Sequence, residues 1–225
     1  MLNNRDRLFR NSLRVTKSML IGLIFLTCNL TWGQSRTFDE VSYFPKSVYS
    51  GMDKVDSMMF IWRSQMMRDF DEPRLGDFQS NSVYRFTWTR SFHEAMTFRL
   101  NISGGEGILI RKTEIKQLQS QDRREKVNRE GGTSMYRSDT IYVDSATVDA
   151  FNSLMAENHL WTMDNTWGQS VIHDGAGWLF EAADIERGYK MLYRQSPDEE
   201  TEKNFRDICL FLIRLTKDFD ELEIY

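Results

Sequence analysis

Cysteine, proline and histidine are all scarce in this sequence. Two cysteines, three prolines and three histidines occur among 225 residues. Two cysteines are too few for a disulfide scaffold or a cysteine-rich zinc module. The histidines, His93, His159 and His173, are too far apart to form a local metal-ligand motif. No nucleophile motif accompanies them, so we expect neither a metal nor any other cofactor.

An excess of positive charge is also missing. The chain carries 29 Lys and Arg residues against 33 Asp and Glu residues, a net charge of −4. A protein that binds nucleic acid would normally present a basic face, so the charge argues against that class of partner. The apolar fraction of 40% and the charged fraction of 28% are typical of a folded globular protein.

The N-terminal 33 residues have the pattern of a signal peptide. Five basic residues lie within the first 17 positions, and an apolar run over 19–30 follows them. This run is too short for a membrane span, which needs about 20 apolar residues. Thr31 and Gly33 provide the small residues that precede a cleavage site. We predict cleavage after Gly33, with an uncleaved anchor or a lipid anchor at Cys28 as alternatives.

Cleavage would leave residues 34–225 as the mature chain, with no membrane span. It would keep 24 of the 29 basic residues and 32 of the 33 acidic residues, for a net charge of −8. Its one cysteine, Cys209, excludes an intrachain disulfide. An exported protein without disulfides fits a bacterial envelope best, so we expect a location in the periplasm or outside the cell.

The mature chain predicts a single α+β domain. Within 83–90, Tyr84, Phe86 and Trp88 alternate with Arg85 and Thr87, as in a strand. Similar segments occur at 96–101, 108–113, 140–143, 177–182 and 189–194. Three segments favour helices: 52–69, one that starts after Asp144 or Ser145, and one that follows residue 196. We predict an antiparallel meander of about six strands with two or three helices packed on one face.

Two of the helices carry more detailed predictions. Apolar residues recur every three or four positions in 52–69, which favours a helix face packed on the sheet: Val55, Met58, Met59, Trp62, Met66 and Phe70. The methionines of this helix also allow an adaptable binding groove. In the last helix, Ser196 as N-cap, Pro197 at the first position and Glu199 two positions later form a capping box. Cys209 lies on the apolar stripe of that helix and should be buried.

A hairpin motif carries a resemblance to other proteins. Asp174-Gly175-Ala176-Gly177-Trp178-Leu179-Phe180-Glu181 is followed by Gly188-Tyr189 and by Arg194-Gln195-Ser196-Pro197. This order resembles the D-G-A-x-W-x-x-E, G-x-Y-H and R-W-S-P segments of a group of bacterial exported proteins for which no activity is known. Lys190 and Gln195 replace the His and Trp of that group. The resemblance implies a shared fold and supplies no function.

Asp174 and Glu181 are the best candidates for paired catalytic carboxylates, with His173 beside them. Two carboxylates at a cleft could act as acid and base in a hydrolase. The alternative is structural: Glu181 would pair across the hairpin with Lys190 or Arg194 and hold the hairpin to the 159–175 loop. In that case Asp174 would accept hydrogen bonds from turn amides.

Aromatic residues suggest a ligand site of another kind. The candidates for a cleft that binds a sugar or a peptide are Trp161, Trp167, Trp178, Tyr189 and Arg194. The same aromatic rings could instead form the core and its lid. We therefore expect a non-enzymatic binding or accessory module of the envelope, with another envelope protein or a small ligand as partner. A hydrolase that uses Asp174 and Glu181 is the alternative, and the sequence does not specify an oligomeric state.

Overall fold

The computed structural model describes residues 42–48, 54–78, 81–115, 136–164 and 175–217. Its centre is one open antiparallel sheet with the strand order β4-β3-β2-β1-β5-β6. The predicted α+β class and the six antiparallel strands are confirmed. Within the described part of the chain, no helix is long and apolar enough to cross a membrane.

The sheet combines a four-stranded meander with a hairpin. The meander consists of β1 (Ser82–Arg90), β2 (Met96–Ser103), β3 (Glu106–Glu114) and β4 (Tyr136–Val143). The hairpin of β5 (Ala176–Asp184) and β6 (Gly188–Gln195) joins it where β5 pairs with β1. The two-residue turn between β2 and β3 uses Gly104 and Gly105 at φ 62° and 84°, a backbone conformation that glycine adopts without strain.

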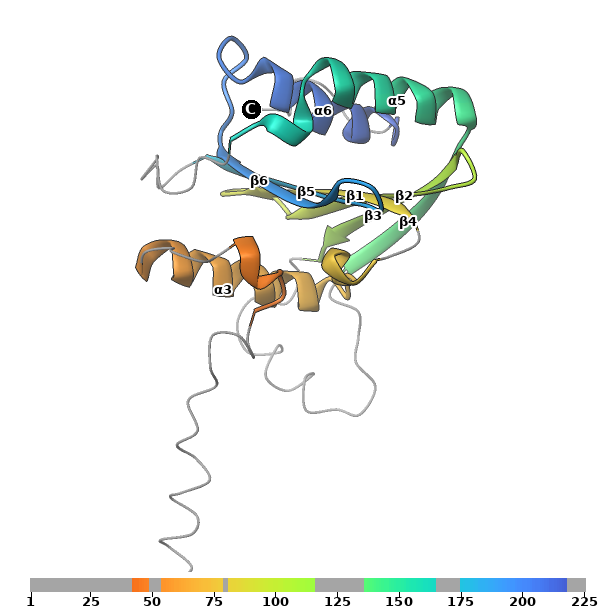
Figure 1. The fold of residues 1–225 in the computed structure, drawn as a ribbon. Coiled ribbons are helices and arrows are strands. Elements are labelled where there is room, and N and C mark those ends of the chain that lie inside the picture. The colour runs from red at the N-terminus through yellow and green to blue at the C-terminus, as the bar shows by residue number, and fades with distance from the viewer. Residues whose placement is uncertain (1–41, 49–53, 79–80, 116–135, 165–174, 218–225) are drawn as a thin grey trace, which may run out of the picture. The chain divides into compact units, whose positions relative to one another are not determined.

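Helices cover both faces of the sheet (Figure 1). Helices α5 (Ser145–Glu157) and α6 (Lys203–Arg214) lie together on one face, in agreement with the predicted two or three helices. The third helix, α3 (Lys54–Asp69), covers the opposite face. The sheet therefore forms the middle of three layers, although side chains near its β4 edge, such as Tyr142 and Ile108, remain exposed.

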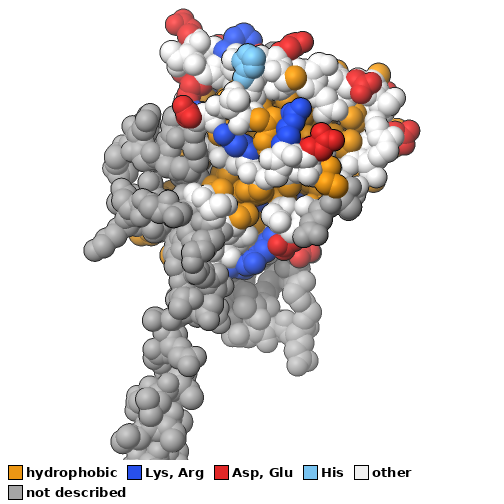
Figure 2. Space-filling view, viewed as in Figure 1, with side chains coloured by type: hydrophobic (Ala, Val, Ile, Leu, Met, Phe, Trp, Pro, Cys, Tyr) orange, Lys and Arg blue, Asp and Glu red, His pale blue; other side chains and the backbone are white. Residues whose placement is uncertain are grey.

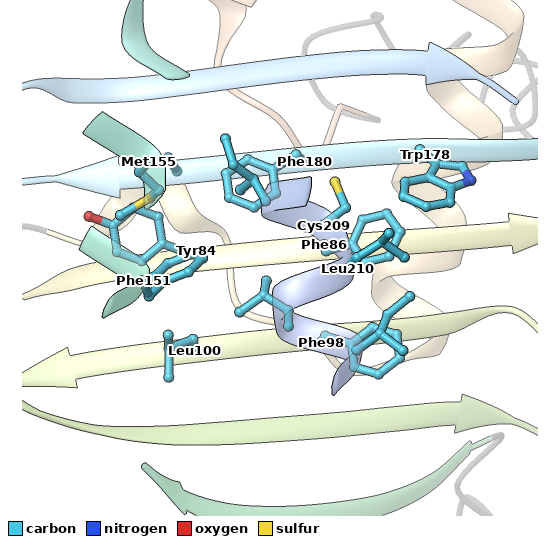
Figure 3. Close-up of a cluster of buried hydrophobic side chains, with 14 of the residues drawn as sticks. Tyr84, Phe86, Phe98, Leu100, Phe151, Met155, Trp178, Phe180, Cys209 and Leu210 are labelled. Carbon is cyan, nitrogen blue, oxygen red and sulfur yellow. The ribbon is translucent and has the colours of Figure 1, made fainter. Parts of the chain in front are cut away.

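The main apolar core lies between the sheet and the pair α5–α6. Tyr84, Phe86 and Trp88 of β1 belong to this core, as their alternation predicted. Figure 3 shows Tyr84 and Phe86 beside Phe151 of α5 and Cys209 of α6. Phe86, Phe151 and Cys209 have no exposed surface. Full burial of one such aromatic side chain stabilises the fold by about 1.5–3 kcal/mol. Cys209 is a free, buried thiol, as predicted.

The two helices of this layer begin in different ways. The Asp144 carboxylate accepts a hydrogen bond from the Thr147 amide at 2.9 Å, so it caps α5 as one of the two predicted candidates. The capping box predicted at Ser196 is wrong, because α6 begins at Lys203. Ser196 Oγ instead accepts from the Ala176 amide at 2.9 Å, which joins the end of β6 to the start of β5.

Candidate functional site

Glu181, the candidate catalytic carboxylate, bonds to Arg85 on β1 and to Tyr189 on β6 rather than to the predicted cations. Its Oε2 lies 2.7 Å from Arg85 Nε on β1, and its Oε1 accepts a 2.7 Å hydrogen bond from the Tyr189 hydroxyl. The prediction of a partner at Lys190 or Arg194 is wrong. The hairpin register places Met191 across from Glu181, so both of those cations lie on the other face of β6.

Arg85 and Glu181 belong to a charged cluster on the α3 side of the sheet, formed by Glu72, Arg85, Arg99, Lys112 and Glu181. Glu72 follows α3 in the chain, and its Oε2 lies 3.2 Å from Arg85 Nη1 and 2.8 Å from Arg99 Nε. Lys112 Nζ is 3.2 Å from the other oxygen of Glu72. Three cations thus surround two carboxylates.

This charged cluster is removed from water. Arg85 is 0% exposed and Glu181 is 1% exposed. Burial alone would lower the pKa of Arg85, but Glu181 and its other neighbours together raise it above its ordinary value. Burial, and then the charge of Glu181, raises the pKa of the Tyr189 hydroxyl well above its ordinary value. Arg85 therefore stays charged and Tyr189 stays neutral at physiological pH.

The charged cluster fastens α3 to the sheet. Lys112 Nζ on β3 donates to the carbonyl oxygens of Phe70 and Asp71, each at 2.7 Å, just beyond the last residue of α3. A cation at this point also interacts favourably with the negative end of the helix dipole. The Tyr43 hydroxyl donates to the Glu72 carbonyl at 2.7 Å. These contacts join α3 to the sheet, so the charged cluster has a structural role.

Lys190 and Arg194 hold the hairpin to the chain segment that follows α5. Lys190 Nζ donates to the Met163 carbonyl and Arg194 Nη2 to the Asp164 carbonyl, both at 2.6 Å. Arg194 Nε also pairs with Glu202 at 2.8 Å. The predicted tie between the hairpin and the 159–175 loop thus exists over its described part, but these cations make it and Glu181 does not.

The described aromatic candidates do not converge on one cleft. Trp178 is fully buried in the core between the sheet and α6, and Trp161 packs at the edge of that core, near Arg187. Tyr189 lies on the opposite face of the sheet, beside Glu181. The remaining predicted site residues, Trp167, His173 and Asp174, lie outside the described residues.

A polar cavity of about 350 Å³ lies beside Arg194, between the end of α5 and the start of α6. Its walls include His159, Glu202 and Asn204. Arg194 is already bonded to Glu202 and to two backbone carbonyls there, so its donors are largely occupied. Figure 2 shows one face of the molecule, where apolar side chains reach the surface with Lys and Arg side chains among them.

A smaller cavity, of about 210 Å³, lies beside the C-terminal half of α3. We call it the α3 cavity, and it is lined by Trp62, Gln65, Met66, Asp69, Phe70, Ala95 and Glu114. Two carboxylates, an exposed indole ring and an apolar floor thus meet in one place. Neither Asp69 nor Glu114 belongs to a recognisable motif, so neither was a predicted site residue.

Helix α3 has an unusual distribution of side chains. The predicted stripe of buried apolar residues is wrong in part, because Met58 is 63% exposed and Trp62 is 50% exposed. Arg63 and Ser64 are buried against the sheet instead. This face of the sheet mixes polar residues such as Arg85 and Thr87 with the apolar Leu179 and Met191. Arg63 stacks on the Tyr193 ring at 3.9 Å from its centre. Arg63 and Ser64 are thus buried beside the apolar residues Phe60 and Met67, while Met58 and Trp62 stay exposed.

Among the residues that the structure describes, no three His, Cys, Asp or Glu side chains gather to form a metal site. Comparison with protein-family models, with curated proteins and with solved structures finds no match. The residues of this chain are therefore the basis for any functional proposal.

Proposed function

We propose that this chain is exported and acts as a non-enzymatic binding or accessory module of a bacterial envelope. The basic start, the short apolar run over 19–30 and the small residues Thr31 and Gly33 support export. The high acidity of the remaining chain is compatible with a protein partner and unfavourable for nucleic acid.

The main support for a binding role over an enzymatic one is that Glu181 is buried and fully hydrogen-bonded. Both of its oxygens are engaged, one by Arg85 and one by Tyr189, and the side chain has almost no contact with water. A general acid or base has to come within hydrogen-bond reach of the group that it protonates or deprotonates. Glu181 in this position is part of a structural ion pair with Arg85. The hydrolase alternative would then have only one of its two proposed catalytic carboxylates.

Carboxylate labelling tests this proposal on the folded protein. The mature chain, residues 34–225, would be treated with a carbodiimide and glycine ethyl ester, and modified peptides would be quantified by mass spectrometry. We expect Glu181 to remain unmodified while Glu157, an exposed residue of α5, reacts readily. Labelling of Glu181 at the rate of Glu157 would show an open site and would favour the hydrolase.

Export has its own test. The intact mass of the protein recovered from the periplasm or the medium of a bacterial host should correspond to residues 34–225. A mass that includes residues 1–33 would contradict cleavage after Gly33.

A further inference from the structure

We infer that the α3 cavity binds a lysine or arginine side chain of a partner protein, and that apolar residues flanking this side chain lie along α3. This inference rests on the proposed role as a binding module and names the chemistry of its partner.

The exposed side of α3 forms one continuous stripe. Met58, Trp62, Gln65 and Asp69 are spaced by four, three and four residues, so they follow one face of the helix. Met58 and Trp62 make the N-terminal half of the stripe apolar, and Gln65 and Asp69 make the C-terminal half polar. A peptide segment bound along this stripe would therefore contact the apolar N-terminal half with one part and the α3 cavity with the adjoining part.

The charge of the α3 cavity favours a cation. Asp69 Oδ1 accepts from Gln65 Nε2 at 2.9 Å, and Glu114 Oε2 accepts from the Ala95 amide at 3.2 Å. These hydrogen bonds hold the two carboxylates in place and leave their other oxygens to a ligand. Among the ion pairs between described residues, none includes Asp69 or Glu114. A cation in the cavity would supply the missing counter-charge.

The rings and the size of the α3 cavity point to a basic side chain. Trp62 and Phe70 line it, and the face of an aromatic ring attracts ammonium and guanidinium groups. Its volume of about 210 Å³ is below the range of roughly 300–1,000 Å³ that is usual for small-molecule sites. A cavity of this size suits one anchoring side chain of a larger partner.

The apolar surface beside the α3 cavity indicates that this partner is a protein. Met58, Met59 and Ile61 are 63%, 37% and 39% exposed, and together with Trp62 they form a group on one helix. Exposed apolar groups of this kind mark interaction surfaces, and methionine adapts its shape to different partners. A peptide segment with a basic residue between apolar residues would complement both parts of the surface.

Selection from a random peptide library on phage provides the test. The library would be panned on immobilised residues 34–225, and the selected peptides would be synthesised with a fluorescent label for anisotropy titrations. Titrations would compare the parent chain with Trp62→Ala, Asp69→Asn and Glu114→Gln. Glu157→Gln and Tyr142→Ala serve as matched controls, because both residues are exposed on other elements.

We expect the selected peptides to share a Lys or Arg next to apolar residues. Trp62→Ala and Asp69→Asn should each weaken binding about tenfold or more, as expected for anchor contacts, and the controls should not change it. Peptides without a basic residue, or equal binding to Trp62→Ala, would overturn the inference. If Glu181 is nevertheless protected from labelling, the proposed module stands and the α3 cavity alone is excluded.

Sedimentation velocity separates a second copy from a different partner. A monomeric parent chain supports the inference. A dimer that Trp62→Ala dissociates would overturn it, because a second copy of the chain would then cover α3.

Discussion

Arg85 on β1 and Glu181 on β5 lie directly opposite each other in the sheet and form a buried ion pair. The register pairs the two residues, and Arg85 Nε is 2.7 Å from Glu181 Oε2. Such a pair contributes little net stability compared with apolar residues, yet the loss of one partner leaves a buried charge without compensation. Glu181 therefore has a structural role: it neutralises the buried charge of Arg85.

Substitution of Glu181 should show that the stability of the fold depends on this ion pair. Glu181→Leu leaves the Arg85 guanidinium with Glu72 as its remaining carboxylate and should cost about 3–5 kcal/mol in the free energy of unfolding. Glu181→Gln should cost less, because the amide oxygen still accepts hydrogen bonds from Arg85 or Tyr189. Urea denaturation of both variants measures the difference. Equal or higher stability of the Leu variant would show that the polar contact is not structural.

Ser196 should behave as a link between strands. Ser196→Ala leaves the buried amide of Ala176 without its side-chain acceptor, which should lower the free energy of unfolding by about 1 kcal/mol. Hydrogen exchange should accelerate at Ala176 and remain unchanged within α6, since that helix begins at Lys203. Faster exchange confined to the first turn of α6 would restore the capping role that the sequence predicted.

The protein should lose stability at alkaline pH. Burial raises the pKa of Cys209, Tyr43 and Tyr189 above their ordinary values. In the unfolded chain these groups ionise near pH 8.5 for cysteine and 10 for tyrosine, so the folded state binds more protons above these values. Their contribution is fully present below pH 8.5 and is lost as the pH rises.

Urea denaturation between pH 7 and 11 tests this dependence. We expect a constant free energy of unfolding up to about pH 8.5, and then a decline that steepens near pH 10. Tyr189→Phe should flatten the decline above pH 10, while Tyr142→Phe, at an exposed position, should alter it less. An identical slope in the parent chain and in Tyr189→Phe would contradict the burial of that hydroxyl.

The strands could be predicted because their evidence is local. Tyr84, Phe86 and Trp88 alternate with polar residues, and a period of two identifies a strand without reference to the rest of the chain. The Gly104–Gly105 turn and the Asp144 cap are also encoded by adjacent residues. These features therefore agree between sequence and structure.

The environment of Arg85 could not be predicted in this way. Alternation assigns Arg85 to the polar face of β1, which in antiparallel sheets is commonly solvated. Helix α3, which precedes β1 in the chain, covers that face and buries the charge. On α3, Met66 and Phe70 are buried as predicted, whereas Trp62 is exposed and Arg63 is buried, which the spacing of the apolar residues did not predict.

The partner of Glu181 on β6 is set by the register of the hairpin. Pairing of Asp184 with Gly188 puts Met191 opposite Glu181, and a shift of one residue would have brought Lys190 or Leu192 there. The turn sets this register, and Lys190 and Arg194 differ from Met191 by an odd number of positions, so both lie on the other face.

The most direct test of the binding role is the affinity of a variant from which the buried pair has been removed. Arg85→Met, Glu181→Leu and Tyr189→Phe together delete both charges and the hydroxyl that depends on Glu181. This variant should fold, because apolar replacement of a buried ion pair is often neutral or stabilising. We predict that it binds the library-selected peptides as the parent chain does. A folded variant that no longer binds them would show that Glu181 takes part in function and would contradict its structural role.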